Sequence, residues 1–363
     1  MENTRMKKVL ERMEERGIDA LFLCPSSNMS YILGSSPIID ERLYLLVLAP
    51  EKEPFIIANA LYEPQVSELQ IPDAYYWRDG EDPYPLLQRQ LNAREIHPRR
   101  AAVDSSMQAR FFMPLTRLLP ETHFVSAEEI INALRVFKDE AEGAALREAC
   151  KKADAALAKT MERGADWLGH SEAEFFAQLA FEMGSLGLKE PGACVCVGEN
   201  AADPHYQGGS GIIEKGKCLL VDFGGTFNNY YTDMTRTFFF GEPDEDFRKI
   251  HSIVLEANLA AQNAAKLGNE LQEVDAAARR VIENYGYGRY FIHRTGHGIG
   301  IDVHENPNAA KGETAEIRPG MAFSIEPGIY LPGRFGVRIE DEALMTEEGV
   351  EILHSFPREL ISY

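Results

Sequence analysis

Residues 323–345 read FSIEPGIYLPGRFGVRIEDEALM. Two apolar, alternating runs flank a Pro-Gly-Arg tip at Gly333, and this pattern predicts a β-hairpin closed by a short loop. Glu326 and Glu340 are equidistant from Gly333, so a hairpin centred there brings their Cβ atoms to about 4.5–5.5 Å on one face. Carboxylates at that distance cannot both stay ionised without a compensating charge. The pair therefore predicts either a shared proton or a bound cation.

A second stretch repeats this arrangement. Residues 218–240 read CLLVDFGGTFNNYYTDMTRTFFF, with one acid in each arm. If the two central asparagines form the turn, Asp233 lies opposite Gly224, and Asp222 is its diagonal neighbour on the same face. Two acid-bearing hairpins predict a domain with pseudo-symmetric halves that face a common site.

A histidine lies between the two hairpins in the sequence. FIHRTGHGIGIDVHE, residues 291–305, places His297 between two glycines, which allow the backbone to approach a crowded site closely. Taken singly, Asp222 also fits a turn-forming position, and Asp233 and Glu340 fit solvent-facing strand positions, so the argument rests on their coincidence. Four carboxylates and one imidazole are too many ligands for one ion and suit two divalent metals. Such hard ligands favour Mn²⁺ or Co²⁺, while Zn²⁺, Fe²⁺ or Mg²⁺ would also fit.

The rest of the chain divides into two domains. In residues 1–135, short apolar runs alternate with helical patterns, which predicts an α/β domain. An Ala-rich, proline-free segment at 138–164 predicts a long helix, and further helices are expected after Ser171 and at about 244–267 and 271–285. With the Gly-rich strands between them, residues 138–363 are expected to form an α+β domain.

Composition excludes several classes of partner. The 363 residues contain 57 acids and 37 bases, and a net charge of −20 disfavours nucleic acid and anionic membranes. The longest apolar run, at Leu43, is strand-sized, and the charged N-terminus lacks the apolar segment of a secretion signal. Five cysteines, without a CxxC pair, are expected to be reduced. We therefore expect a cytoplasmic protein that neither spans nor binds a membrane.

Four motifs in order, VDFGG followed by Asp233, then GHGIG, IEPG and RIED, closely resemble the pita-bread metallopeptidases of the prolidase and Xaa-Pro aminopeptidase branch. The resemblance covers residues 138–363. Over residues 1–135 it is one of arrangement only, to the creatinase/prolidase N-terminal domain. The resemblance implies a dinuclear site for two divalent metal ions per chain, with these ligands: Asp222, Asp233, His297, Glu326 and Glu340.

Other residues receive roles from the same resemblance. His205 and His304 resemble the catalytic, substrate-side histidines of the family. His293 and Thr235 are expected to support the ligands from behind. Arg338 shares a strand face with Glu340 by parity, and its guanidinium fork suits either a ligand carboxylate or a substrate carboxylate.

The expected reaction is hydrolysis of the peptide bond before proline in Xaa-Pro dipeptides, by a metal-bridging hydroxide with Glu326 as general base. Three alternatives remain open: an Xaa-Pro aminopeptidase acting on longer peptides, an amidinohydrolase of creatinase type, and a catalytically silent binding protein. Tyr206 and Tyr330 are candidates for lining a proline pocket. By resemblance, we expect a homodimer formed through residues 1–135, a domain that would also control substrate access.

Overall fold

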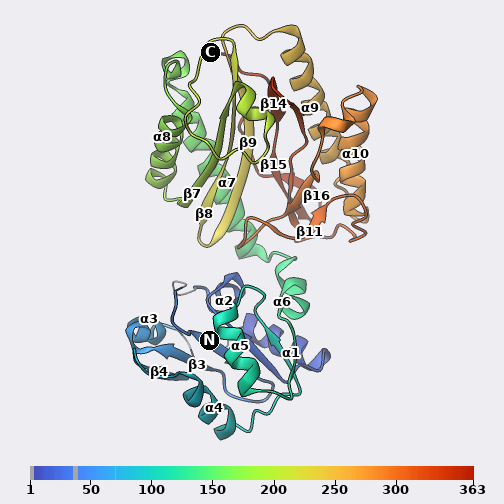
Figure 1. Ribbon diagram of the computed structural model, residues 1–363. Coiled ribbons are helices and arrows are strands. Elements are labelled where there is room, and N and C mark those ends of the chain that lie inside the picture. Colours follow the sequence, from blue (N-terminus) through green and yellow to red (C-terminus); the bar gives the residue numbers. More distant parts are fainter. Residues whose placement is uncertain (1–3, 36–39, 70) are drawn as a thin grey trace. The chain divides into compact units, whose positions relative to one another are not determined.

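The computed structural model describes residues 4–35, 40–69 and 71–363. It divides into two compact units, Met1–Arg135 and Val136–Tyr363 (Figure 1). Each unit has its own β-structure and its own hydrophobic core. Within the described part of the chain, no helix is long and apolar enough to cross a membrane.

The first unit is a six-stranded mixed sheet with helices around it, as expected for an α/β domain. The strand order is β4-β3-β2-β1-β5-β6, in which β1 runs parallel to β5 and antiparallel to β2. The strands are β1 (Ala20–Leu23), β2 (Leu45–Leu48), β3 (Phe55–Asn59), β4 (Asp73–Trp77), β5 (Arg100–Val103) and β6 (His123–Ser126). The α-helices are α1 (Thr4–Glu15), α2 (Ser27–Leu33), α3 (Glu63–Ser67), α4 (Tyr84–Ala93), α5 (Ala109–Leu118) and α6 (Glu128–Arg135).

Alternate strand residues build the core on one face of this sheet. Phe22, Val47 and Ile57 pack together with Leu87 of α4 and Leu115 of α5. The period of two in these strands and the helical period in α4 and α5 place the apolar side chains on facing surfaces. The edge strand β4 was not expected from the sequence, because DAYYW starts with an acid and only its last residue is buried.

The second unit contains two helix pairs and three sheets. Its α-helices are α7 (Glu140–Met161), α8 (Glu172–Ser185), α9 (Glu245–Ala264) and α10 (Leu271–Asn284). The sheets have the orders β7-β8-β9, β11-β10-β12-β15-β16 and β13-β14. The strands are β7 (Lys189–Val197), β8 (Lys217–Phe227), β9 (Tyr230–Phe240), β10 (Gly296–Gly298), β11 (Glu305–Ala309), β12 (Ala322–Ile325), β13 (Gly328–Leu331), β14 (Phe335–Arg338), β15 (Asp341–Thr346) and β16 (Gly349–Ile352).

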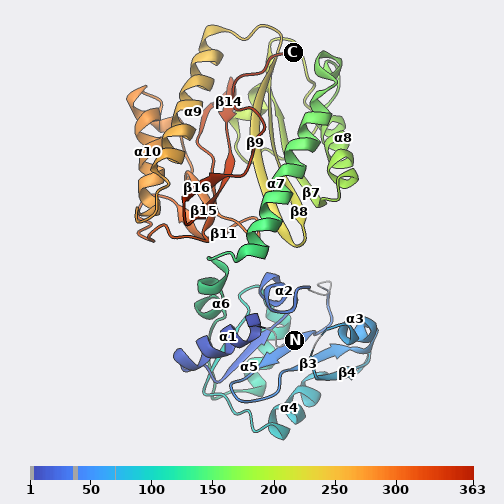
Figure 2. The ribbon, with the colours of Figure 1, turned by 180° about the vertical axis from the view of Figure 1, so that it is seen from behind.

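The two halves of this unit are built alike. Helices α7 and α8 pack against β7, β8 and β9, and α9 and α10 lie on the other flank, beside the C-terminal strands (Figures 1 and 2). Ser171 caps the start of helix α8: its side chain accepts a hydrogen bond from the N–H of Glu174, and the Glu174 carboxylate accepts one from the N–H of Ser171. The predicted fold, with pseudo-symmetric halves, is confirmed.

Candidate metal centre

The hairpin at residues 323–345 has the predicted register but is divided between two sheets. Ile325 pairs with Asp341 in the larger sheet, and Gly328 pairs with Arg338 in the β13-β14 sheet. Both pairs are centred on Gly333, which has φ of 70°. The prediction of one continuous hairpin was therefore too simple. The arms separate around Pro327, which has no N–H to donate, and Glu326 and Glu340 lie at this break.

The hairpin of β8 and β9 is continuous and follows the predicted pairing. Asn228 and Asn229 both have positive φ, as a two-residue hairpin turn requires. Asp233 pairs with Gly224, and Asp222 pairs with Thr235. A Cβ on Gly224 would lie 2.2 Å from a backbone oxygen of Thr232. The close approach of the two strands beside Asp233 therefore requires glycine.

His297 is held in β10 with one ring nitrogen turned toward the acids. Its Nδ1 lies 3.1 Å from the carbonyl of Gly298, to which it donates, so Nε2 presents its lone pair. Nε2 is 3.3 Å from Glu326 Oε1 and 3.7 Å from Asp233 Oδ2. Glycine precedes His297 because a Cβ on Gly296 would lie 1.8 Å from the backbone oxygen of Ser324.

The structure brings all five sequence-predicted ligand residues together. Their donor atoms form overlapping groups in which every atom lies within 4.8 Å of the others. One group is Asp222, Asp233 and Glu340, and another is His297, Glu326 and Glu340. Oxygen and imidazole nitrogen donors in this number match the preferences of divalent cations such as Mn²⁺, Co²⁺ or Zn²⁺.

The electrostatics of the cluster favour a bound cation. Burial, followed by repulsion from the other acids, raises the pKa values of Asp233 and Glu340 well above their ordinary range. Burial raises the pKa of Glu326 to about 7 and lowers that of His297 to about 3. Among the described residues, the buried Oε1 of Glu340 has no hydrogen-bond partner. A cation between these donors would relieve the repulsion and satisfy that oxygen.

Arg338 and Thr235 support the acids from behind. Thr235 Oγ1 donates to Glu340 Oε2 at 2.6 Å and accepts from Arg338 Nε at 2.9 Å. Arg338 also donates to Asp222 Oδ2 at 2.6 Å and to the hydroxyl of Tyr330 at 2.8 Å. Of the two roles considered for Arg338, this geometry favours orientation of a ligand carboxylate, because all three of its nitrogen atoms are engaged.

His293 and Tyr330 extend this support. His293 Nε2 lies 2.8 Å from the Tyr330 hydroxyl, and Nδ1 lies 2.7 Å from the carbonyl of Arg294. Burial lowers the pKa of His293 to about 4, so the ring is neutral at pH 7. Tyr330 is buried and is not among the residues that line the cavity next to the ligand cluster. Its suggested place in a proline pocket is not supported, whereas Tyr206 does line that cavity.

A cavity of about 900 Å³ opens onto the cluster. His205 and His304 both line it, although they come from separate loops. The ring of His304 lies edge-on to that of His297, with 4.2 Å between centroids. Apolar walls complete the cavity, formed by these residues: Ala173, Phe176, Ala193, Val195 and Pro204.

Two cavity residues were missed by the sequence interpretation. Glu172 accepts hydrogen bonds from the N–H groups of Val197 and Gly211, and so fixes the loop that carries His205. Arg294 lines the cavity, and its guanidinium makes no hydrogen bond or ion pair with any residue that the structure describes. The sequence could have indicated Arg294 through its position in the HRTGHG motif, where it is a cation close in the chain to the ligand residue His297.

The chain is similar to known peptidases over nearly its whole length. Residues 144–347 match metallopeptidase family M24, and residues 5–137 match the Creatinase/Prolidase N-terminal domain. The chain is 38% identical to a probable dipeptidase, PepE, of Mycobacterium tuberculosis, over 96% of this chain and 92% of that one. It is 33% identical to an Xaa-Pro dipeptidase of Pyrococcus horikoshii, over 99% of each chain. The crystal structure of a recombinant prolidase from Thermococcus sibiricus superposes with a TM-score of 0.95, at 33% identity and with full coverage of both chains.

Proposed function

Because the chain belongs to metallopeptidase family M24, we propose that it hydrolyses the peptide bond before proline in Xaa-Pro dipeptides, using divalent metal ions. The observation that carries the proposal is the cluster of five ligand residues with a buried, unpartnered oxygen on Glu340. The ions would be held by Asp222, Asp233, His297, Glu326 and Glu340. When bound, they would polarise the substrate carbonyl and acidify the attacking water.

Glu326 is the proposed general base. Its carboxylate lines the cavity and lies within the ligand cluster, with Oε1 3.3 Å from His297 Nε2, where a water activated by the ions would be within its reach. His205 and His304 line the same cavity and are proposed to donate hydrogen bonds to the substrate carbonyl as negative charge develops on its oxygen. Burial, followed by the nearby charge of Arg294, lowers the pKa of His304. Donation from a neutral imidazole is therefore expected there.

Arg294 favours a dipeptidase over an aminopeptidase. An Xaa-Pro dipeptide presents a free carboxylate directly after the proline ring, whereas a longer peptide has a neutral amide there. The Arg294 guanidinium lines the cavity and has no hydrogen bond or ion pair with any described residue, so it suits that carboxylate. Arg338, the other arginine of the lining, is already bonded to Asp222. Loss of ligand residues would be expected in a silent binding protein or in a metal-free amidinohydrolase, and all five are present.

One substrate series tests this proposal. After chelation and reloading with Mn²⁺, the chain should cleave Ala-Pro faster than the amide Ala-Pro-NH₂ and the tripeptide Ala-Pro-Ala. Arg294→Met should raise KM for Ala-Pro about tenfold while changing that for the amide little. Arg334→Met, at an exposed arginine paired with Asp246, is the matched control. Preferential cleavage of the tripeptide would assign the chain to the aminopeptidases.

Manganese or cobalt is the proposed metal, on the ligand chemistry given above, and comparison of reloaded ions by activity would test the choice. The homodimer formed through residues 1–135 and the cytoplasmic location stay predictions from the sequence. Sedimentation of the purified chain would test the first and cell fractionation the second.

A further inference from the structure

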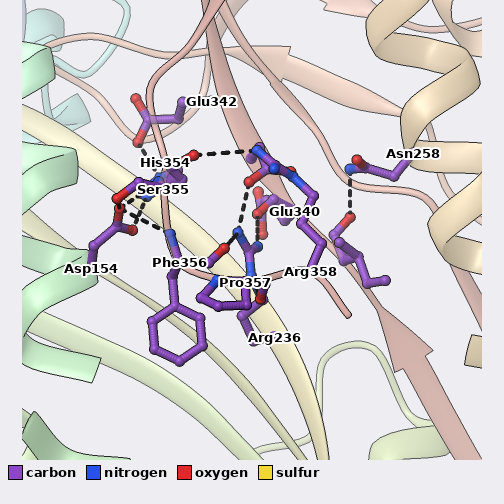
Figure 3. A network of polar contacts seen from close by, with 12 residues as sticks. Asp154, Arg236, Asn258, Glu340, Glu342, His354, Ser355, Phe356, Pro357 and Arg358 are labelled. Atoms are coloured by element: carbon purple, nitrogen blue, oxygen red, sulfur yellow. Dashed lines mark hydrogen bonds and ion pairs between the residues drawn. The ribbon is translucent and has the colours of Figure 1, made fainter. Parts of the chain in front are cut away.

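A buried polar network lies directly behind one of the proposed ligands. It contains Asp154 of α7, Glu342 of β15 and His354, which follows β16 (Figure 3). The side chains of Glu342 and His354 are 0% exposed, and that of Asp154 is 9% exposed. Burial of this many ionisable groups is costly unless each is held by specific partners. The partners of this network therefore indicate its role.

The network holds both outward-facing backbone groups of Asp233. Glu342 Oε1 accepts a hydrogen bond from the Asp233 N–H at 2.7 Å. His354 Nε2 donates to the Asp233 carbonyl at 3.1 Å. Asp233 belongs to β9, the last strand of its sheet, so these outward groups have no neighbouring strand within that sheet. Two buried side chains take the place of a strand at this residue.

Asp154 fixes the orientation of His354. Its Oδ1 lies 2.9 Å from His354 Nδ1, while its Oδ2 accepts from the backbone N–H and the hydroxyl of Ser355. Both ring nitrogens of His354 therefore face acceptors, and both must donate. The ring is an imidazolium between Asp154 and Glu342, whose Oε1 is 3.5 Å from Nε2.

The cluster also resembles a metal site, because donor atoms of Cys150, Glu342 and His354 lie within 4.8 Å of one another. Metal ligation by His354 would require a lone pair on the nitrogen that faces the cluster. That nitrogen already donates to the carbonyl of Asp233. The hydrogen bonds of His354 and of Glu342 Oε1 thus assign these groups to support of Asp233, while the other oxygen of Glu342, Oε2, has no hydrogen-bond partner among the described residues.

We propose that Glu342, His354 and Asp154 are positioning residues that hold Asp233 in its ligand geometry and so set the affinity of the site for divalent cations. The proposal rests on the proposed function, in which Asp233 is a ligand. Glu342 acts in a second way, since its charge adds to the negative potential at Asp233. The distance of 2.7 Å between Glu342 Oε1 and the Asp233 nitrogen places that carboxylate directly beside the ligand residue.

Two nearly isosteric variants test this proposal. Glu342→Gln keeps an oxygen acceptor for the Asp233 N–H and removes the charge. Asp154→Asn alters a residue that has no hydrogen bond to Asp233, so any effect on the site is indirect, through His354 or through the backbone at Ser355. Supporting groups behind metal ligands typically change metal affinity about 10–100-fold. Glu351→Gln, at the exposed partner of Arg147 on neighbouring β16, is the matched control.

The measurement is titration of the metal-free full-length chain with Mn²⁺ by calorimetry, with circular dichroism to establish that each variant is folded. Visible absorption of the Co²⁺-loaded chain reports the ligand geometry separately. We expect Kd to rise at least tenfold for both variants, with an altered Co²⁺ spectrum and an unchanged control. Kd values within twofold of wild type for both would overturn the proposal. If the two variants change Kd as expected but the wild-type chain cleaves no Xaa-Pro peptide, the proposed activity is refuted and the positioning role is not. If the wild-type chain does not bind Mn²⁺, both the proposed activity and the positioning role are refuted.

Discussion

Replacement of Glu326 by glutamine should stabilise the metal-free chain at high pH, although it removes the proposed general base. The pKa of Glu326 is raised from 4.5 to about 7 in the folded chain, chiefly by burial. When the pKa of a group is higher in the folded state than in the unfolded state, its contribution to stability is fully present below the unfolded-state pKa. That contribution is lost as the pH rises through the folded-state pKa. For Glu326, the loss falls between pH 4.5 and about 7.

The size of this effect follows from the displacement of the pKa. A tenfold change in an equilibrium is worth about 1.4 kcal/mol, so the full displacement corresponds to about 3 kcal/mol. The Glu326 side chain is 16% exposed at the cavity wall, and solvent there reduces the cost, so we expect about 2–3 kcal/mol. Glutamine resembles the protonated acid, so the variant should match wild type at pH 4 and exceed its unfolding free energy by this amount at pH 8.

Urea unfolding of both chains in the presence of a chelator, over pH 4 to 8, measures the difference directly. Comparison with wild type at each pH removes the contributions of the other titratable groups that the two chains share. Glu347→Gln, at an exposed acid of the same unit, should show no pH-dependent difference. At a Mn²⁺ concentration of about 1,000 times Kd the order should reverse, because binding then stabilises folded wild type by about 4.1 kcal/mol, which exceeds the advantage of the variant, and glutamine is a poor ligand. A metal-free variant no more stable than wild type at pH 8 would refute the reasoning.

Three further predictions concern activity and the supporting structure. His297→Ala should reduce hydrolysis of Ala-Pro at least 100-fold with little change in circular dichroism, and retained activity would remove this residue from the site. Lys138→Met should lower the free energy of unfolding, measured by thermal unfolding, by about 3–5 kcal/mol, because it removes the buried cation 3.0 Å from Glu305. A decrease below about 1 kcal/mol would contradict this argument from buried charge. Asn258→Leu should lower the free energy of unfolding by about 2–4 kcal/mol, because the Asn258 Nδ2 donates at 3.1 Å to carbonyls of both hairpin arms beside the break. An unchanged midpoint in urea unfolding would show that water replaces this amide as the donor.

Local patterns determined most of what the sequence could predict. The registers of both acid-bearing hairpins follow from a period of two and from turn residues at Gly333 and at Asn228 with Asn229. Those registers place Glu326, Glu340, Asp222 and Asp233, and the flanking glycines indicate the crowding around His297. Pro327 was a visible signal for the break in the longer hairpin, but the change of sheet depends on tertiary packing.

Long-range partners were out of reach of sequence reasoning. His354 contacts Asp154, 200 residues earlier in the chain, and no local period connects them. The alternation of strand residues placed Arg338 on the same face as Glu340. Only the structure shows that the donors of Arg338 are already hydrogen-bonded, to Asp222 among others, whereas Arg294 lines the cavity. Whether a side chain is paired or available depends on neighbours from distant elements.

The tip of the divided hairpin offers a use in engineering. Residues 332–334 are exposed and lie outside the cavity lining, and pairing on both sides of the break is centred on Gly333. A short Gly-Ser insertion at this tip would lengthen the loop without shifting either arm relative to the other. An epitope tag or a fluorophore could be carried there, whereas a single residue added between Glu326 and Leu331 would change the register that brings the two glutamates together.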